Sequence, residues 1–274
     1  MARMFALLSA FVSLVLIAVL TISCGGSSNS KIQQGCTGGP YNVVGDWQIT
    51  VSDNGAGSLS GYGAIDSAGL ALFFDNSQAT ESTGDTVQLP TITGACSFTG
   101  DLTAYAEPGG LASGSMITDS ALGNVTSATA INGTFTGSGS NPSGTFTLAP
   151  LAALTGSASA ITGDRTGAVQ GALNGQPVLL PVSFSPTGTN ASMSFTSTVV
   201  GLCGATGSFT QVNTANVFDV SITLSGSGCG ITGTFTGLGF ESSTDYFNVN
   251  GNNPDTYLYA DILASTNTFV IEFF

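Results

Sequence analysis

The feature that most constrains this chain is a short segment that occurs twice. The sequence Ile-Asn-Gly-Thr-Phe-Thr-Gly at residues 131–137 returns as Ile-Thr-Gly-Thr-Phe-Thr-Gly at residues 231–237. A second pair of segments, residues 94–103 and 201–210, shares the pattern G-x-C-x-x-T-G-x-[LF]-T. Because both repeated segments have one copy in the first half of the chain and one in the second, we expect an internal duplication.

The repeated segment alternates as a half-buried β-strand does. In Thr134-Phe135-Thr136 an aromatic residue is flanked by two β-branched hydroxyl residues, so the ring points to one face and both threonines to the other. We therefore expect Phe135, Phe146 and Phe235 in the core, the threonines toward solvent and the glycines at turns. The Thr-x-Thr units are spaced too irregularly for the flat threonine ladder of an ice-binding solenoid.

The chain beyond residue 41 keeps this rhythm of strand and turn. Residues 45–52 place Trp47, Ile49 and Val51 on one face. Further candidate strands follow about every ten residues with Gly, Asn or Asp between them, and no window has the periodicity and caps of a helix. The predicted strands cover residues 45–52, 58–65, 69–75, 86–93, 97–105, 125–136, 144–148, 155–162, 167–173, 178–184, 191–199, 206–212, 217–224, 231–236, 246–249, 257–263 and 268–274.

One break in the rhythm, Leu-Ala-Pro-Leu-Ala-Ala-Leu at residues 148–154, marks the border between the halves. We predict an all-β fold, an antiparallel meander of many short strands. Its two similar halves, residues 41–150 and 151–274, form a β-sandwich or a barrel. Trp47, the only tryptophan, is expected to seal one end of the first core.

The N-terminus predicts a signal helix that is cleaved from the fold, residues 1–23. Arg3 precedes an almost unbroken apolar run over residues 5–22. The run ends in Leu-Thr-Ile-Ser-Cys, which resembles the lipobox of bacterial lipoprotein signal peptides, with its leucine one position earlier than usual. The resemblance implies that Cys24 is lipidated and becomes the mature N-terminus. An ordinary cleaved signal peptide and a retained membrane helix are the alternatives.

Residues 24–40 are expected to be a flexible tether, because the run after the cysteine is Gly-Gly-Ser-Ser-Asn-Ser. The resemblance to lipoproteins implies an N-terminal acyl anchor in the lipid bilayer. Since Gly25 rather than Asp follows the cysteine, it also implies delivery to the outer membrane of the cell envelope, on its periplasmic or surface face.

The charge balance excludes one class of partner. Without Arg3 the chain keeps only Lys31 and Arg165 against 16 acidic residues, a net charge of −14. Such a surface repels phosphate groups, so we expect neither nucleic-acid binding nor a polybasic contact with membranes. A protein or glycan partner is not identified by the sequence.

Four cysteines remain if Cys24 carries lipid, an even number that suits an oxidising compartment. Three pairings are possible, and the duplication favours one disulfide in each half, Cys36 with Cys96 and Cys203 with Cys229. No C-x-x-C pair or histidine accompanies them, so we do not expect them to bind a metal ion.

The sequence offers little to a catalytic mechanism. It contains no histidine, which excludes the Ser-His-Asp triad, the Cys-His pair and His-ligated zinc. Acid and amide residues at 53–54, 75–76 and 250–255 are typical of turns, and none forms a D-x-[DN]-x-[DN]-G calcium loop. We therefore expect no catalytic residues, metal site or cofactor.

The chain also resembles the Gly/Thr/Ser-rich all-β envelope lipoproteins of bacteria, through its G-x-W opening at residues 45–47 and its C-G-x-T-G-T-F-T-G segment at residues 229–237. This resemblance carries no activity with it. The expected function is a non-enzymatic, lipid-anchored structural or binding module. The alternatives are a barrel that binds a small apolar ligand or glycan, and a glycoside hydrolase with two carboxylates in a cleft.

Overall fold

The computed structural model describes residues 39–54, 57–75, 86–105, 116–139, 143–151, 161, 163–169, 178–197, 203–226, 232–243, 257–264 and 267–273. The predicted signal helix and nearly all of the predicted tether lie outside these residues. Among the described residues, no helix has the length and apolar character needed to cross a membrane.

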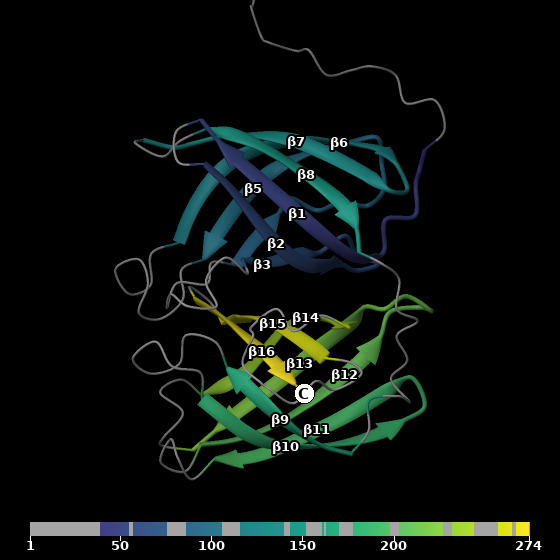
Figure 1. The fold of residues 1–274 in the computed structure, drawn as a ribbon, viewed down its shortest axis with the longest axis vertical. Coiled ribbons are helices and arrows are strands. Elements are labelled where there is room, and N and C mark those ends of the chain that lie inside the picture. Colours follow the sequence, from purple (N-terminus) through teal and green to yellow (C-terminus); the bar gives the residue numbers. More distant parts are fainter. Residues whose placement is uncertain are drawn as a thin grey trace, which may run out of the picture. The chain divides into compact units, whose positions relative to one another are not determined.

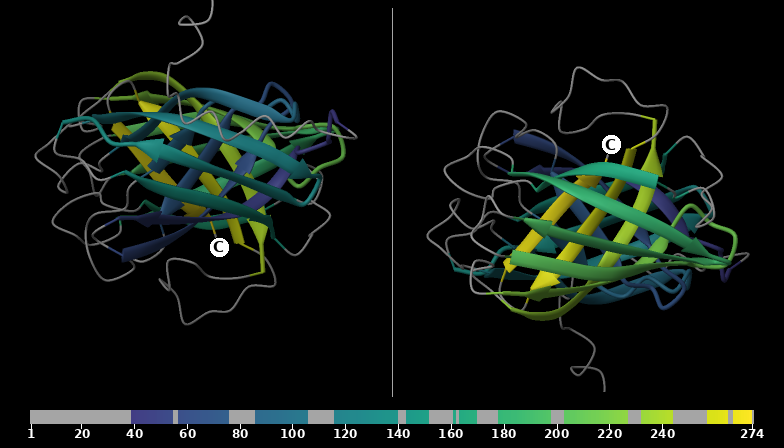
Figure 2. Two further views of the ribbon diagram at one scale, coloured as in Figure 1. Left: turned by 90° about the horizontal axis from the view of Figure 1, so that it is seen from above. Right: turned by 90° about the horizontal axis from the view of Figure 1, so that it is seen from below.

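The described strands form two closed antiparallel barrels of eight strands each (Figures 1 and 2). In the first barrel the strands follow sequence order and β8 pairs with β1. In the second, β9 closes the ring between β10 and β16. The all-β prediction is confirmed, with closed barrels rather than a sandwich, and closure leaves no open sheet edge.

The strand bounds are as follows: β1 Gly45–Asp53, β2 Gly57–Ile65, β3 Ala71–Asp75, β4 Thr86–Leu89, β5 Ser97–Tyr105, β6 Met116–Ser127, β7 Ala130–Thr136, β8 Gly144–Pro150, β9 Gly163–Val169, β10 Val178–Thr187, β11 Asn190–Ser197, β12 Cys203–Gln211, β13 Phe218–Ser225, β14 Gly233–Ser242, β15 Tyr257–Ala264 and β16 Asn267–Phe273.

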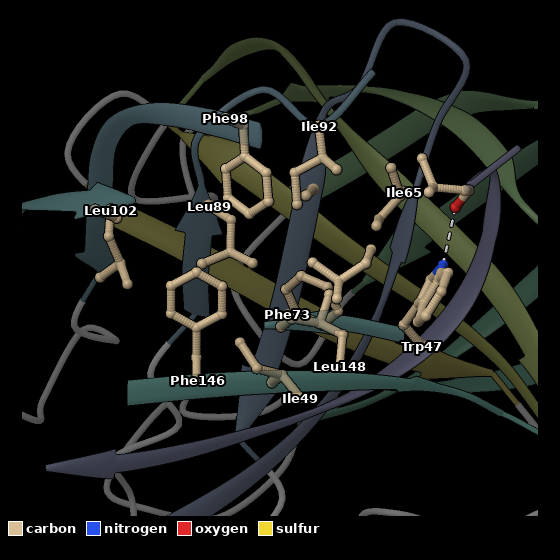
Figure 3. Close-up of a cluster of buried hydrophobic side chains, with 14 of the residues drawn as sticks. Trp47, Ile49, Ile65, Phe73, Leu89, Ile92, Phe98, Leu102, Phe146 and Leu148 are labelled. Atoms are coloured by element: carbon tan, nitrogen blue, oxygen red, sulfur yellow. Dashed lines mark hydrogen bonds between the residues drawn. The ribbon is translucent and has the colours of Figure 1, made fainter. Parts of the chain in front are cut away.

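The interior of the first barrel is filled by the apolar face of its strands (Figure 3). Trp47 is 2% exposed, and its indole Nε1 donates a hydrogen bond to the Val43 carbonyl oxygen at 2.9 Å. The bond satisfies the only polar atom of the ring, so the tryptophan packs in the core as predicted. Phe135 and Phe146 are also buried, and Phe235 packs against the second core, while the threonines beside them are exposed.

The expectation that the glycines serve as turns is wrong for a set of them. Several lie inside strands and face the barrel interior, where a bulky partner occupies the space that a side chain would need. The ring of Phe98 covers Gly123 on the neighbouring strand, and the ring of Phe146 covers Gly133 in the same way. At these positions an aromatic ring fills the space beside a glycine on the neighbouring strand.

A single strand was predicted over residues 125–136, and the structure has a hairpin there. β6 ends at Ser127 and β7 begins at Ala130, so the turn contains no Gly, Pro or Asn. Hydroxyl groups form it instead: Thr126 Oγ1 donates to the Ala130 carbonyl oxygen at 3.0 Å, and the Thr129 amide donates to Ser127 Oγ at 3.1 Å. Turns of this kind lack the strongest sequence signals.

The two repeated sequence segments do not lie in equivalent strands of the two barrels. Phe135 lies in β7, the seventh strand of the first barrel, and Phe235 in β14, the sixth strand of the second. The other repeated segment links β5, a fifth strand, to β12, a fourth. In both cases the copy in the second barrel lies one strand earlier than its counterpart in the first barrel. Because each barrel is closed, this shift is equivalent to rotating one barrel by one strand relative to the other.

Candidate functional site

Aromatic rings pack against one another inside both barrels. In the first, Phe98 on β5 meets Phe146 on β8 with ring centroids 6.2 Å apart, although these strands are not neighbours. In the second, Phe209 on β12 lies 5.9 Å from Phe273 on β16 and 5.7 Å from Phe184 on β10. In the first barrel the two rings meet over Gly123 and Gly133, paired on the strands between them. In the second, side chains from opposite walls touch. Together with the buried apolar side chains around the rings, both interiors form packed cores.

The most unusual buried groups lie outside the barrels, in a seam where their outer faces pack together. We call this contact the seam. It consists of an apolar cluster separate from the two barrel cores, together with the polar residues Asp46, Thr86, Asn216 and Asp261. Phe74 of β3 lies 6.0 Å from the Phe240 ring of β14 and 5.5 Å from the Tyr259 ring of β15. The buried apolar members are Ala64, Leu72, Phe74, Val212, Val217, Leu238, Phe240, Tyr257, Tyr259 and Val270.

Asp261 of β15 is a carboxylic acid buried in this seam. It is 4% exposed, and its Oδ1 accepts a hydrogen bond from Thr86 Oγ1 of β4 at 3.0 Å. Its Oδ2 is buried and has no hydrogen-bond partner among the described residues. Burial raises the pKa of the Asp261 carboxyl to about 7, and the Thr86 bond opposes that rise only in part.

The strand next to Thr86 brings a second titratable group to this carboxyl. Tyr105 of β5 pairs with Thr86 in register, and its hydroxyl donates to Gln88 Oε1 at 2.9 Å. Burial, and after it the negative charge of Asp261, raise the pKa of Tyr105. Both effects keep the phenol protonated, so it remains a hydrogen-bond donor.

A second polar group joins the barrels at the start of β1. The side chain of Asn216 donates from Nδ2 to the Glu241 carbonyl oxygen at 2.7 Å and accepts the Glu241 amide at Oδ1, 3.1 Å away. Asn216 also bonds the carboxyl of Asp46. Burial raises the pKa of Asp46 to about 6, while its own backbone and the Asn216 amide lower it in part.

Two further acids approach each other across the barrels. Asp66, in the turn after β2, accepts the Leu70 amide at Oδ1 at 2.7 Å. Desolvation, followed by the Asp66 carboxylate, raises the pKa of Asp219 on β13. Within the described residues, no group of three or more acids, cysteines or histidines is placed to hold a metal ion.

Replacing Asn216 by alanine is expected to lower the free energy of unfolding by about 1–3 kcal/mol, because it removes both hydrogen bonds to the buried Glu241 backbone. Chemical denaturation measures this. Asn132→Ala is the matched control, since Asn132 is exposed on β7, and we expect a change within about 0.5 kcal/mol. An equal fall in the free energy of unfolding in both variants would contradict the stabilising role of the Asn216 hydrogen bonds.

The residues that the sequence singled out are only partly described. Cys24, Cys36 and Cys229 lie outside the described residues, and Cys203 is described by its backbone in β12 alone. Cys96 lies before β5, where its carbonyl oxygen accepts the Val125 amide at 3.0 Å, and it is disulfide-bonded. Its partner's side chain is not among those described, so the pairing with Cys36 stays a prediction.

Sequence reasoning missed Asp261, although the strand around it carries a signal. In Tyr257-Leu258-Tyr259-Ala260-Asp261-Ile262 nearly every residue is apolar or aromatic, so neither face of the strand has the polar pattern of a solvent surface. Such strands are covered on both faces. An acid within one is a buried acid, and buried acids have perturbed pKa values.

No protein-family model matches this sequence, and neither a curated protein nor a solved structure was found to match it.

Proposed function

We propose that this protein is a non-enzymatic, lipid-anchored module of the cell envelope that acts through its outer surface as a structural or binding unit. The observation that carries the proposal is that both barrel interiors are filled with buried apolar side chains, with ring contacts in each. A barrel that carries a ligand needs a cavity where these rings lie. The packed interiors therefore favour a structural or surface-binding role over the ligand-carrier alternative.

The outer face of the second barrel supports a role at the surface. Register places hydroxyl residues opposite one another on five consecutive strands, β10 to β14, in two continuous rows. Within one row, Thr223 Oγ1 and Thr234 Oγ1 are 2.8 Å apart. Such a surface is polar without charge, and it suits hydrogen bonding rather than ion pairing. The rows are Ser183, Ser194, Thr206, Thr223 and Thr234, and Ser185, Ser192, Ser208, Ser221 and Thr236.

The anchor is tested with Cys24→Ala. We expect the wild-type protein to fractionate with membranes and its intact mass to begin at Cys24 with a lipid increment, whereas the variant loses the increment and its membrane association. Ser27→Ala, in the same predicted tether, is expected to behave as wild type. Membrane association that survives Cys24→Ala would overturn the lipoprotein part of the proposal.

The packed interior is tested separately with a small apolar fluorescent probe. We expect no saturable binding to the folded wild-type protein, because the rings already occupy the interior. Saturable binding at a ratio of one probe per barrel would favour the ligand-carrier alternative instead.

A further inference from the structure

The described residues packed around Asp261 present it with uncharged groups. Its register neighbours in the second barrel are Leu238 on β14 and Val270 on β16. From the first barrel, Thr86 of β4 donates the one hydrogen bond that the carboxyl accepts within the described part of the chain. Strand β3 brings Phe74, the register neighbour of Thr86. Tyr105 of β5 is the titratable group that faces it.

No described side chain in the seam carries a positive charge that could neutralise an ionised Asp261. The two basic residues after the predicted signal helix are Lys31 and Arg165, and neither side chain is among those described. An ionised carboxylate at this place would keep one hydrogen bond and leave Oδ2 without a partner. A protonated carboxyl is neutral and fits the apolar surroundings.

We propose that the seam between the two barrels is a pH-dependent contact, closed while Asp261 is protonated and loosened when Asp261 ionises. The geometry behind this is a buried, incompletely bonded acid at the junction of two bodies that each have a complete core of their own. Each barrel keeps its packing when the seam loosens. The inference does not depend on the lipid anchor or on any partner.

The direction of the pH effect follows from the proton affinity of the buried carboxyls, which is higher when the seam is closed than when it is open. Burial raises the pKa of Asp261 from 3.8 to about 7 and that of Asp46 from 3.8 to about 6. Closing is therefore most favourable below the ordinary pKa of these acids, and it is lost progressively as pH rises through the window toward 7. Asp219, whose pKa is also raised, acts in the same direction.

Footprinting by hydroxyl radicals, read by mass spectrometry on the full mature protein, distinguishes seam opening from unfolding. Adjacent residues on opposite faces serve as internal controls, because Phe74 lies in the seam and Phe73 in the barrel core, and both are 1% exposed. Between about pH 5 and about pH 8.5 we expect oxidation of Phe74 and Tyr259 to rise severalfold and that of Phe73 to stay constant.

Asp261→Asn is the decisive variant, because asparagine is neutral at every pH and keeps an oxygen for Thr86. It is expected to remove most of the rise in Phe74 oxidation between the two pH values, and the small remainder comes from Asp46 and Asp219. Asp101→Asn, which removes an exposed carboxylate from β5, is expected to respond as wild type. The proposal is overturned if Phe74 oxidation is independent of pH in the wild type, if Asp261→Asn shows the same rise, or if Phe73 becomes exposed together with Phe74.

Discussion

Replacing Phe209 by alanine is expected to lower the free energy of unfolding of the second barrel by about 3–5 kcal/mol. Phe209 is fully buried, and its ring lies 5.7–6.4 Å from three other rings, those of Phe184, Phe218 and Phe273. These rings come from different walls of a closed barrel, whose hydrogen-bonded strands cannot move inward to fill the space. The variant therefore contains a cavity at the centre of the core.

Calorimetry of the full chain measures this loss. Leu122→Ala is the matched control, since Leu122 is a large apolar residue that is 37% exposed on the first barrel, and we expect it to cost less than about 1 kcal/mol. The cavity left by Phe209→Ala is also expected to bind the small apolar probe that the wild type excludes. A loss no larger than that of Leu122→Ala would show that the rings do not pack as a core.

Replacing Gly63 by alanine is expected to destabilise the first barrel by more than about 3 kcal/mol, beyond the usual cost of an overpacked core. Gly63 stands between Trp47 on β1 and Phe73 on β3 in register. A Cβ at this position would lie 1.8 Å from the Leu72 carbonyl oxygen. That atom belongs to the backbone, so the two strands would have to separate.

The fluorescence of Trp47, the only tryptophan, reports this change because the indole is buried in the same barrel. The control is Gly45→Ala on β1, where an added Cβ would meet only the Trp47 indole nitrogen at 3.7 Å, an ordinary contact. We expect the denaturation midpoint of Gly63→Ala to fall well below those of wild type and control. Equal midpoints for the two variants would contradict the close approach of β2 and β3.

The repeated Thr-Phe-Thr segments were sufficient to predict which side chains enter the core. Alternation in a strand has a period of two, so the burial of Phe135 and the exposure of Thr134 and Thr136 follow from local geometry alone. The same argument placed Trp47 in the first core. These features depend on neighbours along the chain, and a sequence contains that information directly.

The glycines could not be assigned in the same way. Whether a glycine makes a turn or lies inside a strand depends on which residue faces it across the sheet, as Phe98 faces Gly123 and Phe146 faces Gly133. Register between strands is a property of the sheet rather than of the local sequence. The hairpin between β6 and β7 was missed for a related reason, because its turn is formed by hydroxyl groups that are also common in strands.

The sequence by itself determined the all-β class, the alternation of core and solvent faces and the strongly acidic charge, because each depends on composition or on near neighbours in the chain. The tertiary structure alone decided that each sheet closes into a barrel and that the repeated segments are shifted by one strand between the barrels. It also decided that Asp261 meets Thr86, 175 positions away in the chain. The pKa of a carboxyl depends on what surrounds it in space. Only the packing of one barrel against the other turns this aspartate into a buried acid.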